Sequence, residues 1–190
     1  ASIVAGLTLM KDLPAADHRG KLAKPFVADN WEAAKMVPLT EEMLIGNWVK
    51  LPAEDGKQKA FGGRMGQIWT ADQPGSKLHF KFKGRTAKVY DLLGPDGGQV
   101  VITVDGKTGA KPVPRFDSYC TYHRIATLGV VSDSDAGAVH DVTIEIHPEQ
   151  PDRKSVAFRL KDPDKELKTP KFQGTRVWMS QLLLLGELAE

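Results

Sequence analysis

The residues best suited to chemistry in this chain lie in the run Phe116-Asp-Ser-Tyr-Cys-Thr-Tyr-His-Arg124. If this run is a strand, alternation places Tyr122 and Arg124 on one face and Tyr119 and His123 on the other. Aromatic rings beside hydrogen-bonding groups suit sugars, because the rings stack on CH faces while the polar groups hold the hydroxyls. Tyr119, Tyr122, His123 and Arg124 are therefore candidate ligand-binding residues.

The same run also fits a structural role, and the sequence favours that role. In this interpretation Phe116, Cys120 and Tyr122 belong to the core, while Tyr119 and His123 pack beneath a neighbouring loop or domain. The sequence leaves both interpretations open.

Hydrolytic chemistry finds little support in the sequence. A serine hydrolase needs a nucleophile on a tight turn, a base within hydrogen-bond reach and a group that orients the base. No Gly-x-Ser-x-Gly or Gly-Asp-Ser-Leu motif occurs, and the only adjacent Asp and His residues are Asp17-His18 and His140-Asp141. Neighbours on a strand point to opposite faces, so His140 and Asp141 cannot act together directly. The sequence predicts no catalytic residue.

Metal ligands are equally sparse. The chain has 5 histidines and 1 cysteine, without the His-x-His or Cys-x-x-Cys spacing that favours zinc. Asp133 and Asp135, and likewise Asp162 and Asp164, could offer oxygens to Ca²⁺ from irregular loops. Such loops are more often solvated turns. We therefore predict no cofactor, with calcium at Asp133 and Asp135 as a weak candidate.

The strands that would position the candidate residues are predicted from the alternation of apolar and polar residues. From Lys77 to Gly106 most apolar residues fall at every second position, the pattern of strands with one buried face. Turn signals at Gly84-Arg85, residues 94–98 and Asp105-Gly106 divide the stretch into an antiparallel meander. Further strands are expected at residues 48–51, 66–70, 115–128, 140–147, 155–160 and 177–185. The predicted fold class is mainly β, an antiparallel β-sandwich.

Residues 1–46 are predicted to lie outside the sandwich. Residues 1–10 have the apolar spacing of the end of a helix that belongs to a preceding domain. Residues 11–46 are predicted to form a connector with short helices at 29–36 and 41–45, and residues 47–190 the sandwich.

The net charge, the cysteine content and the length of the apolar runs limit the classes of partner and compartment that the sequence supports. The formal charge of +2 gives no field that would favour nucleic acid or an anionic membrane as a partner. The single Cys120 excludes an internal disulfide and leaves the redox compartment open. No apolar run reaches the roughly 18 residues that a membrane helix needs.

Several short motifs together resemble a known domain. They are Phe82-Lys-Gly-Arg85, Leu93-Gly-Pro-Asp96, Val104-Asp-Gly106 and His140-Asp-Val-Thr-Ile144, followed by the apolar segment 177–185. This succession resembles the jelly-roll, galactose-binding-like domain attached to many bacterial SGNH (GDSL-type) esterases, and the resemblance covers roughly residues 47–190.

The resemblance implies a non-catalytic accessory domain of a secreted or periplasmic carbohydrate esterase. Such a domain would pack on an SGNH catalytic domain, in the same or a companion polypeptide, or help to present acylated sugars. Neither the Gly-Asp-Ser nor the Asp-x-x-His block of the family occurs here, so no catalytic residue carries over. An independent carbohydrate-binding module and a hydrolase with an unrecognised site remain the alternatives.

Overall fold

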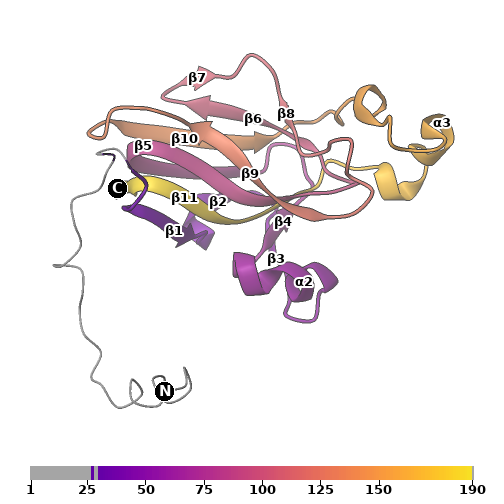
Figure 1. Ribbon diagram of the computed structural model, residues 1–190, viewed down its shortest axis with the longest axis horizontal. Coiled ribbons are helices and arrows are strands. Elements are labelled where there is room, and N and C mark those ends of the chain that lie inside the picture. Colours follow the sequence, from indigo (N-terminus) through magenta and orange to yellow (C-terminus); the bar gives the residue numbers. More distant parts are fainter. Residues whose placement is uncertain (1–26, 28–29, 190) are drawn as a thin grey trace, which may run out of the picture. The chain divides into compact units, whose positions relative to one another are not determined.

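A computed structural model describes residue 27 and residues 30–189 (Figure 1). The chain divides into two units, residues 1–31 and 32–190, and the fold described below belongs to the second. The predicted helix end at residues 1–10 lies outside the described residues, as does most of the predicted connector before residue 30. The domain limits given above therefore stay predictions.

The predicted fold class is confirmed, since the described residues are mainly β. The longest strands are β5 (Lys77–Leu93), β11 (Val177–Ala189), β9 (Arg124–Val131) and β10 (Val139–Ile146). The shorter strands are β1 (Ala34–Pro38), β2 (Leu44–Ile45), β3 (Val49–Lys50), β4 (Trp69–Ala71), β6 (Gln99–Val104), β7 (Lys107–Thr108) and β8 (Val113–Pro114). The main path of the sheet runs β3-β4-β11-β5-β10-β6-β7, and the pairings between these strands are antiparallel.

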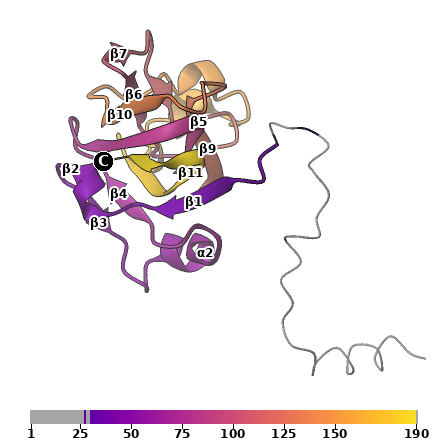
Figure 2. The same cartoon turned by 90° about the vertical axis from the view of Figure 1, so that its left-hand side faces the viewer.

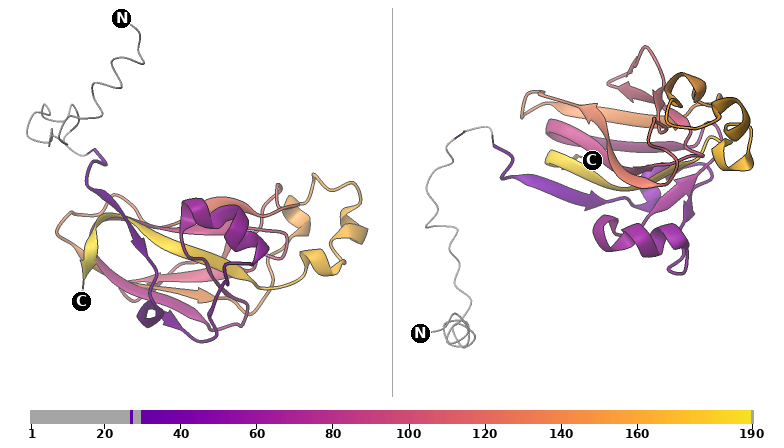
Figure 3. Two further views of the ribbon diagram at one scale, coloured as in Figure 1. Left: turned by 90° about the horizontal axis from the view of Figure 1, so that it is seen from below. Right: turned by 45° about the vertical axis from the view of Figure 1, so that its right-hand side comes forward.

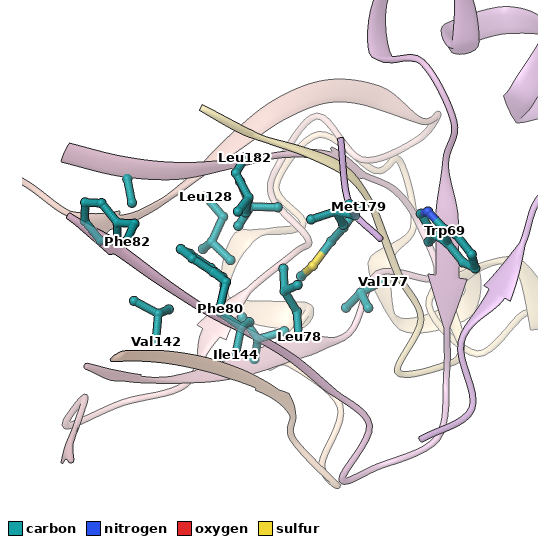
Figure 4. Packing of buried hydrophobic residues seen from close by; sticks show 14 of the residues in the cluster. Trp69, Leu78, Phe80, Phe82, Leu128, Val142, Ile144, Val177, Met179 and Leu182 are labelled. Carbon is teal, nitrogen blue, oxygen red and sulfur yellow. The ribbon is translucent and has the colours of Figure 1, made fainter. Parts of the chain in front are cut away.

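Strand β5 is the centre of the arrangement, because it pairs with β11 along one edge and with β9 and then β10 along the other. Its alternate residues Leu78, Phe80 and Phe82 are buried, as the period-2 pattern predicted. Figure 4 shows these side chains between two layers of strands, together with residues from β9, β10 and β11. Each large apolar side chain buried in this way contributes roughly 1.5–3 kcal/mol.

The turn predicted at Gly84-Arg85 is wrong. The strand continues through Gly84, which lies opposite Gly186 of β11 where the register of the pair shifts. Both glycines have positive φ angles, 151° and 153°. A Cβ on Gly84 would meet the carbonyl oxygen of Leu185, and one on Gly186 would meet that of Lys83. Only glycine lets the two backbones approach so closely, so the site is a β-bulge instead of a turn.

The other two turn signals are correct. Residues 94–98 form the turn after β5, and Asp105-Gly106 forms the hairpin between β6 and β7 with both φ angles positive, 52° and 76°. Two positive φ angles are the requirement of a type I′ turn, which explains the Asp-Gly sequence.

The predicted helix at 29–36 is also wrong, because residues 34–38 form β1. This strand pairs with the segment Gln181–Leu185 of β11, so backbone pairing at a free sheet edge outweighs a weak capping signal. Residues 41–45 contain only a short 3-10 helix, η2 (Glu41–Met43), followed by β2.

A helix that the sequence analysis did not predict lies between β3 and β4. Helix α2 (Gly56–Met65) begins at Asp55, whose side chain accepts hydrogen bonds from the backbone N–H groups of Lys57 and Gln58. Met65 at its end packs with Trp178 and Leu92 in a second buried cluster. The left view of Figure 3 shows α2 lying across the face of the sheet that carries β11.

Candidate functional site

The loops that carry the predicted binding residues gather at one end of the sandwich. This loop end consists of residues 94–98, 115–123 and 147–176, the last of which includes α3 (Pro163–Glu166), η3 (Lys154–Val156) and η4 (Pro170–Phe172). Figures 1 and 3 place α3 at the opposite end of the sandwich from the connection between β9 and β10, and Figure 2 shows the layers of strands between.

Residues 115–123 are not the strand that alternation suggested. Asp117 starts a turn, in which its side chain accepts the N–H of Tyr119 at 2.9 Å and its carbonyl accepts the N–H of Cys120 at 3.0 Å. Asp hydrogen bonds of this kind compete with strand pairing. The assignment of Tyr119, Tyr122, His123 and Arg124 to two strand faces is therefore wrong.

The turn is anchored by its apolar residues. Phe116 and Cys120 are buried with Leu93 and Phe172 in a third cluster, so this part of the structural interpretation is confirmed. Burial raises the pKa of the Cys120 thiol to about 11, which leaves it unreactive at neutral pH. Tyr122, by contrast, is 59% exposed and does not belong to the core.

A buried guanidinium joins the loops to one another. Arg153 donates to the carbonyl oxygens of Gly97 at 2.7 Å, Gly174 at 2.9 Å and Pro95 at 3.3 Å. Its remaining nitrogen donates to the Gln150 side chain at 2.6 Å. The five donors of a guanidinium can satisfy carbonyls from several directions at once, so Arg153 fixes the 147–176 loop against the 94–98 turn.

A buried ion pair lies beneath the loop end. The Arg115 guanidinium approaches the Asp91 carboxylate to 2.6 Å, and both side chains are almost completely buried. Burial raises the pKa of Asp91 to about 6, although the charge of Arg115 acts in the opposite direction.

Above this base lies an exposed group that we call the aromatic patch, made of Tyr119, Phe158 and Arg159. The Arg159 guanidinium lies 3.8 Å from the centre of the Tyr119 ring and 5.7 Å from that of Phe158, and it also donates to the Tyr119 hydroxyl at 2.7 Å. Tyr119 is 48% and Phe158 74% exposed. Two aromatic rings near one cation are thus exposed to solvent.

The structure brings only some of the predicted residues to this patch. Arg124 pairs with the Asp117 carboxylate and lies 5.7 Å from the Tyr119 ring, so it supports the patch from its side. His123 has turned inward, where its Nε2 lies 3.1 Å from the Asp96 carboxylate and its ring packs edge-on against Trp178 at 4.7 Å. Of the four predicted residues, Tyr119 and Arg124 meet at the patch, and His123 helps to hold the turn below it.

A polar hollow lies beside this inner layer. Its volume is about 340 Å³, and Asp72, Asp96 and Arg176 supply its charged walls. Arg176 lies 2.7 Å from Asp72 and 3.7 Å from Asp96. Burial alone would raise the pKa of Asp96, but the hydrogen bond and charge of His123, with the charge of Arg176, lower it below its usual value. The Asp96 carboxylate therefore stays ionised at neutral pH.

Phe158 and Arg159 were missed as site residues, because residues 155–160 were read as a strand. The structure shows η3 and turns there instead. The available signal was the closely spaced Pro151, Pro163 and Pro170, which are typical of an irregular segment.

The described part of the chain offers little to a metal ion or a membrane. There, no group of three or more His, Cys, Asp or Glu side chains is placed to hold a metal ion. At the weak calcium candidate, Asp135 accepts the N–H of Gly137 at 2.6 Å, and no such group forms around Asp133 and Asp135. Nor do residues 30–189 contain a helix with the length and apolar character of a membrane span.

Comparison with known proteins shows the fold but not a family. No protein-family model matches the chain, and no curated protein matches it. A two-domain esterase (CEX) active on acetylated mannans has a similar structure, with a TM-score of 0.58 and 12% identity over 99% of this chain. The same kind of esterase co-crystallised with mannopentaose gives a TM-score of 0.57 and 13% identity over 99% of this chain.

Both matches involve only part of the larger protein. This chain spans 46% of the first esterase and 45% of the second. A family two carbohydrate esterase from Cellvibrio japonicus is also similar, with a TM-score of 0.47 and 12% identity over 82% of this chain and 34% of that one. At 12% and 13% identity the likeness to the two-domain esterase structures shows a shared fold alone, and the site has to be argued from its own geometry.

Proposed function

We propose that this chain is a carbohydrate-binding accessory β-sandwich of an esterase that acts on acylated sugars, and that the aromatic patch holds the sugar. The observation that carries the proposal is the exposure of Tyr119 and Phe158 beside the Arg159 guanidinium. Exposed aromatic rings on loops that are fixed from below are typical of binding surfaces.

The chemistry of the patch suits a sugar ring. The apolar CH face of a pyranose stacks on a Tyr or Phe ring, while guanidinium and phenol groups donate hydrogen bonds to its hydroxyls. Arg124 and Asp117 fix the Tyr119 side of the patch, and the Arg153 contacts fix the loop that bears Phe158. A rigid patch binds with a smaller entropy cost than a mobile one.

The comparisons support the wider setting of the proposal. The two similar structures are of a two-domain esterase (CEX) active on acetylated mannans, one of them co-crystallised with mannopentaose, and this chain matches less than half of each. We infer that an SGNH-type catalytic domain, in the same or a companion bacterial polypeptide, is the partner. Acetylated mannan is accordingly the first ligand to test.

Isothermal titration of the full chain with mannopentaose and with acetylated mannan tests the sugar site. Tyr119→Ala and Phe158→Ala should each weaken binding about tenfold, since a stacked ring contributes roughly 1 kcal/mol or more beyond its buried area. Met36→Ala truncates a side chain that is equally exposed but lies on β1, and it should leave binding unchanged. Folded wild-type chain that binds neither ligand, or patch variants that bind as wild type does, would contradict the proposal.

A further inference from the structure

A hydroxyl, an imidazole and a carboxylate are aligned at the end of the sandwich opposite the aromatic patch. The Ser134 hydroxyl lies 2.7 Å from His140 Nε2, and His140 Nδ1 lies 2.8 Å from the Asp105 carboxylate. Ser134 belongs to the loop between β9 and β10, His140 to β10, and Asp105 to the turn between β6 and β7. Sequence reasoning missed this group because it paired His140 with its neighbour Asp141.

The hydrogen bonds define the proton positions. A carboxylate only accepts hydrogen bonds, so Nδ1 of neutral His140 carries the proton and donates it to Asp105. The free lone pair on Nε2 then accepts the hydroxyl proton of Ser134. The three groups therefore stand in the relation of nucleophile, general base and orienting acid.

Asp105 is held in place independently of the histidine. Its second carboxylate oxygen accepts the backbone N–H of Asp141 at 2.8 Å, and its own N–H donates to the carbonyl of Asp141 at 2.9 Å. The hydrogen bond from His140 is the main cause that lowers the pKa of Asp105, so the carboxylate stays ionised at neutral pH. The His140 side chain is 12% exposed, with its ring centre 5.2 Å from that of Phe82. Base and orienting acid are thus preassembled.

The loop around Ser134 presents donors for a negatively charged oxygen. The N–H of Ser134 donates to the carbonyl of Arg85 at 3.0 Å, and those of Gly137 and Ala138 donate to Asp135. The N–H groups of Asp135 and Ala136, directly after the serine, donate no hydrogen bond within the described residues. The N–H of the residue that follows a nucleophile is a common member of an oxyanion hole.

We propose that Ser134, His140 and Asp105 form a second functional site, a serine nucleophile that hydrolyses carboxylic esters of small acyl groups. Ser134 attacks the ester carbonyl while its proton passes to His140. The carbon–oxygen bond to the alcohol then breaks, and the alcohol leaves with that proton. Water, deprotonated by His140, attacks the acyl-serine, which releases the carboxylic acid and returns the proton to Ser134. The reaction consumes only the ester and water, and it needs no oxidant or metal.

The surroundings of the site define the kind of ester. The Asp105 side chain is 45% exposed, and the residues next to Ser134 are exposed as well. Such an open site suits an acetyl or similar ester carried on an extended molecule.

A serine-reactive fluorophosphonate and p-nitrophenyl acetate, applied to the full chain, test this site without any sugar. The probe should modify one residue, Ser134, as located by mass spectrometry of the digested protein. Ser134→Ala should remove labelling and lower acetate release roughly 100-fold, and His140→Gln should have a similar effect, in line with the usual share of a nucleophile–base pair. Ser132→Ala, an exposed serine in the same loop, is the matched control and should behave as wild type.

The alternative is that these hydrogen bonds only brace the loop. In that case folded wild-type chain stays unlabelled at Ser134, and Ser134→Ala releases acetate as fast as wild type; either result overturns the proposal. Because labelling is measured on the wild-type chain, it decides the question even if a variant fails to fold. Neither readout depends on the aromatic patch, so failure of one proposal leaves the other intact.

Discussion

At the loop end of the sandwich one guanidinium, that of Arg153, is buried and bonded on several sides, whereas at the opposite end Ser134, His140 and Asp105 are hydrogen-bonded in a row that begins in a partly exposed loop. The guanidinium of Arg153 donates hydrogen bonds to three carbonyls and a glutamine side chain. These bonds fix the loops and leave few donors for a ligand. The Ser134 hydroxyl instead has one hydrogen-bond partner, His140, and it lies in a loop whose neighbouring residues are exposed. Saturated polar networks give rigidity, and directed ones give reactivity.

The largest expected effect comes from removing the centre of the saturated network. Arg153→Met keeps much of the apolar volume but leaves the carbonyls of Pro95, Gly97 and Gly174 without a donor. Unsatisfied buried groups cost about 1–3 kcal/mol each, so we expect a loss of roughly 3 kcal/mol or more in the free energy of unfolding. Urea denaturation measures it. A loss below about 1 kcal/mol would show that the loops do not depend on Arg153.

A change of pH is expected to have an intermediate effect on the free energy of unfolding, through the titration of Asp91 beneath the loop end. Its pKa is raised to about 6 in the folded chain from an ordinary value of 3.8, so the folded state holds the proton more tightly than the unfolded state does. The resulting stability is present below about pH 4 and is lost as the pH rises towards 6. We expect a change on the order of 1–2 kcal/mol across that window.

The pH effect of Asp91 is isolated by comparison with a variant. Asp96 and Asp105 have lowered pKa values and change stability in the opposite direction, because their contribution is lost as the pH falls. The difference in unfolding free energy between wild type and Asp91→Asn removes these shared terms. That difference should change between pH 4 and 6, and a constant difference would contradict a raised pKa of Asp91.

The smallest effect on stability is expected at the opposite end. Ser134→Ala removes one hydrogen bond from a loop with exposed neighbours, so the free energy of unfolding should fall by about 1 kcal/mol or less. Thermal denaturation of wild type and variant measures the difference. A loss as large as that of Arg153→Met would mean that the two ends do not differ in the way described above.

The sequence predicted the regular part of the fold better than the site. Alternation along β5 and β10 identified the strands, because burial of one face imposes a period of two on the side chains. The same logic failed at residues 115–123, where an Asp side chain bonds to the backbone and the apolar residues pack inside a turn. Alternation cannot distinguish a strand from such a turn.

The sequence also failed to predict the contacts between residues that are far apart along the chain. Arg159 meets Tyr119, and Asp105 meets His140, only because the sheet order brings their loops together. The Asp105-Gly106 turn was recognised as a hairpin, yet nothing in the local sequence shows that β10 pairs with β6. Register across non-consecutive strands is a tertiary property, and it decides which side chains share a site.

The position of β11 has a consequence for synthesis in the cell. Among the strands of residues 30–189 this segment is last in order, yet it occupies the middle of the sheet, between β5 on one side and β1 and β4 on the other. While a ribosome is still making residues 177–189, the nascent polypeptide exposes the edge of β5 with which β11 will later pair. Assembly of the sheet therefore waits for the last strand to emerge, and during that interval the growing chain is most in need of protection by chaperones.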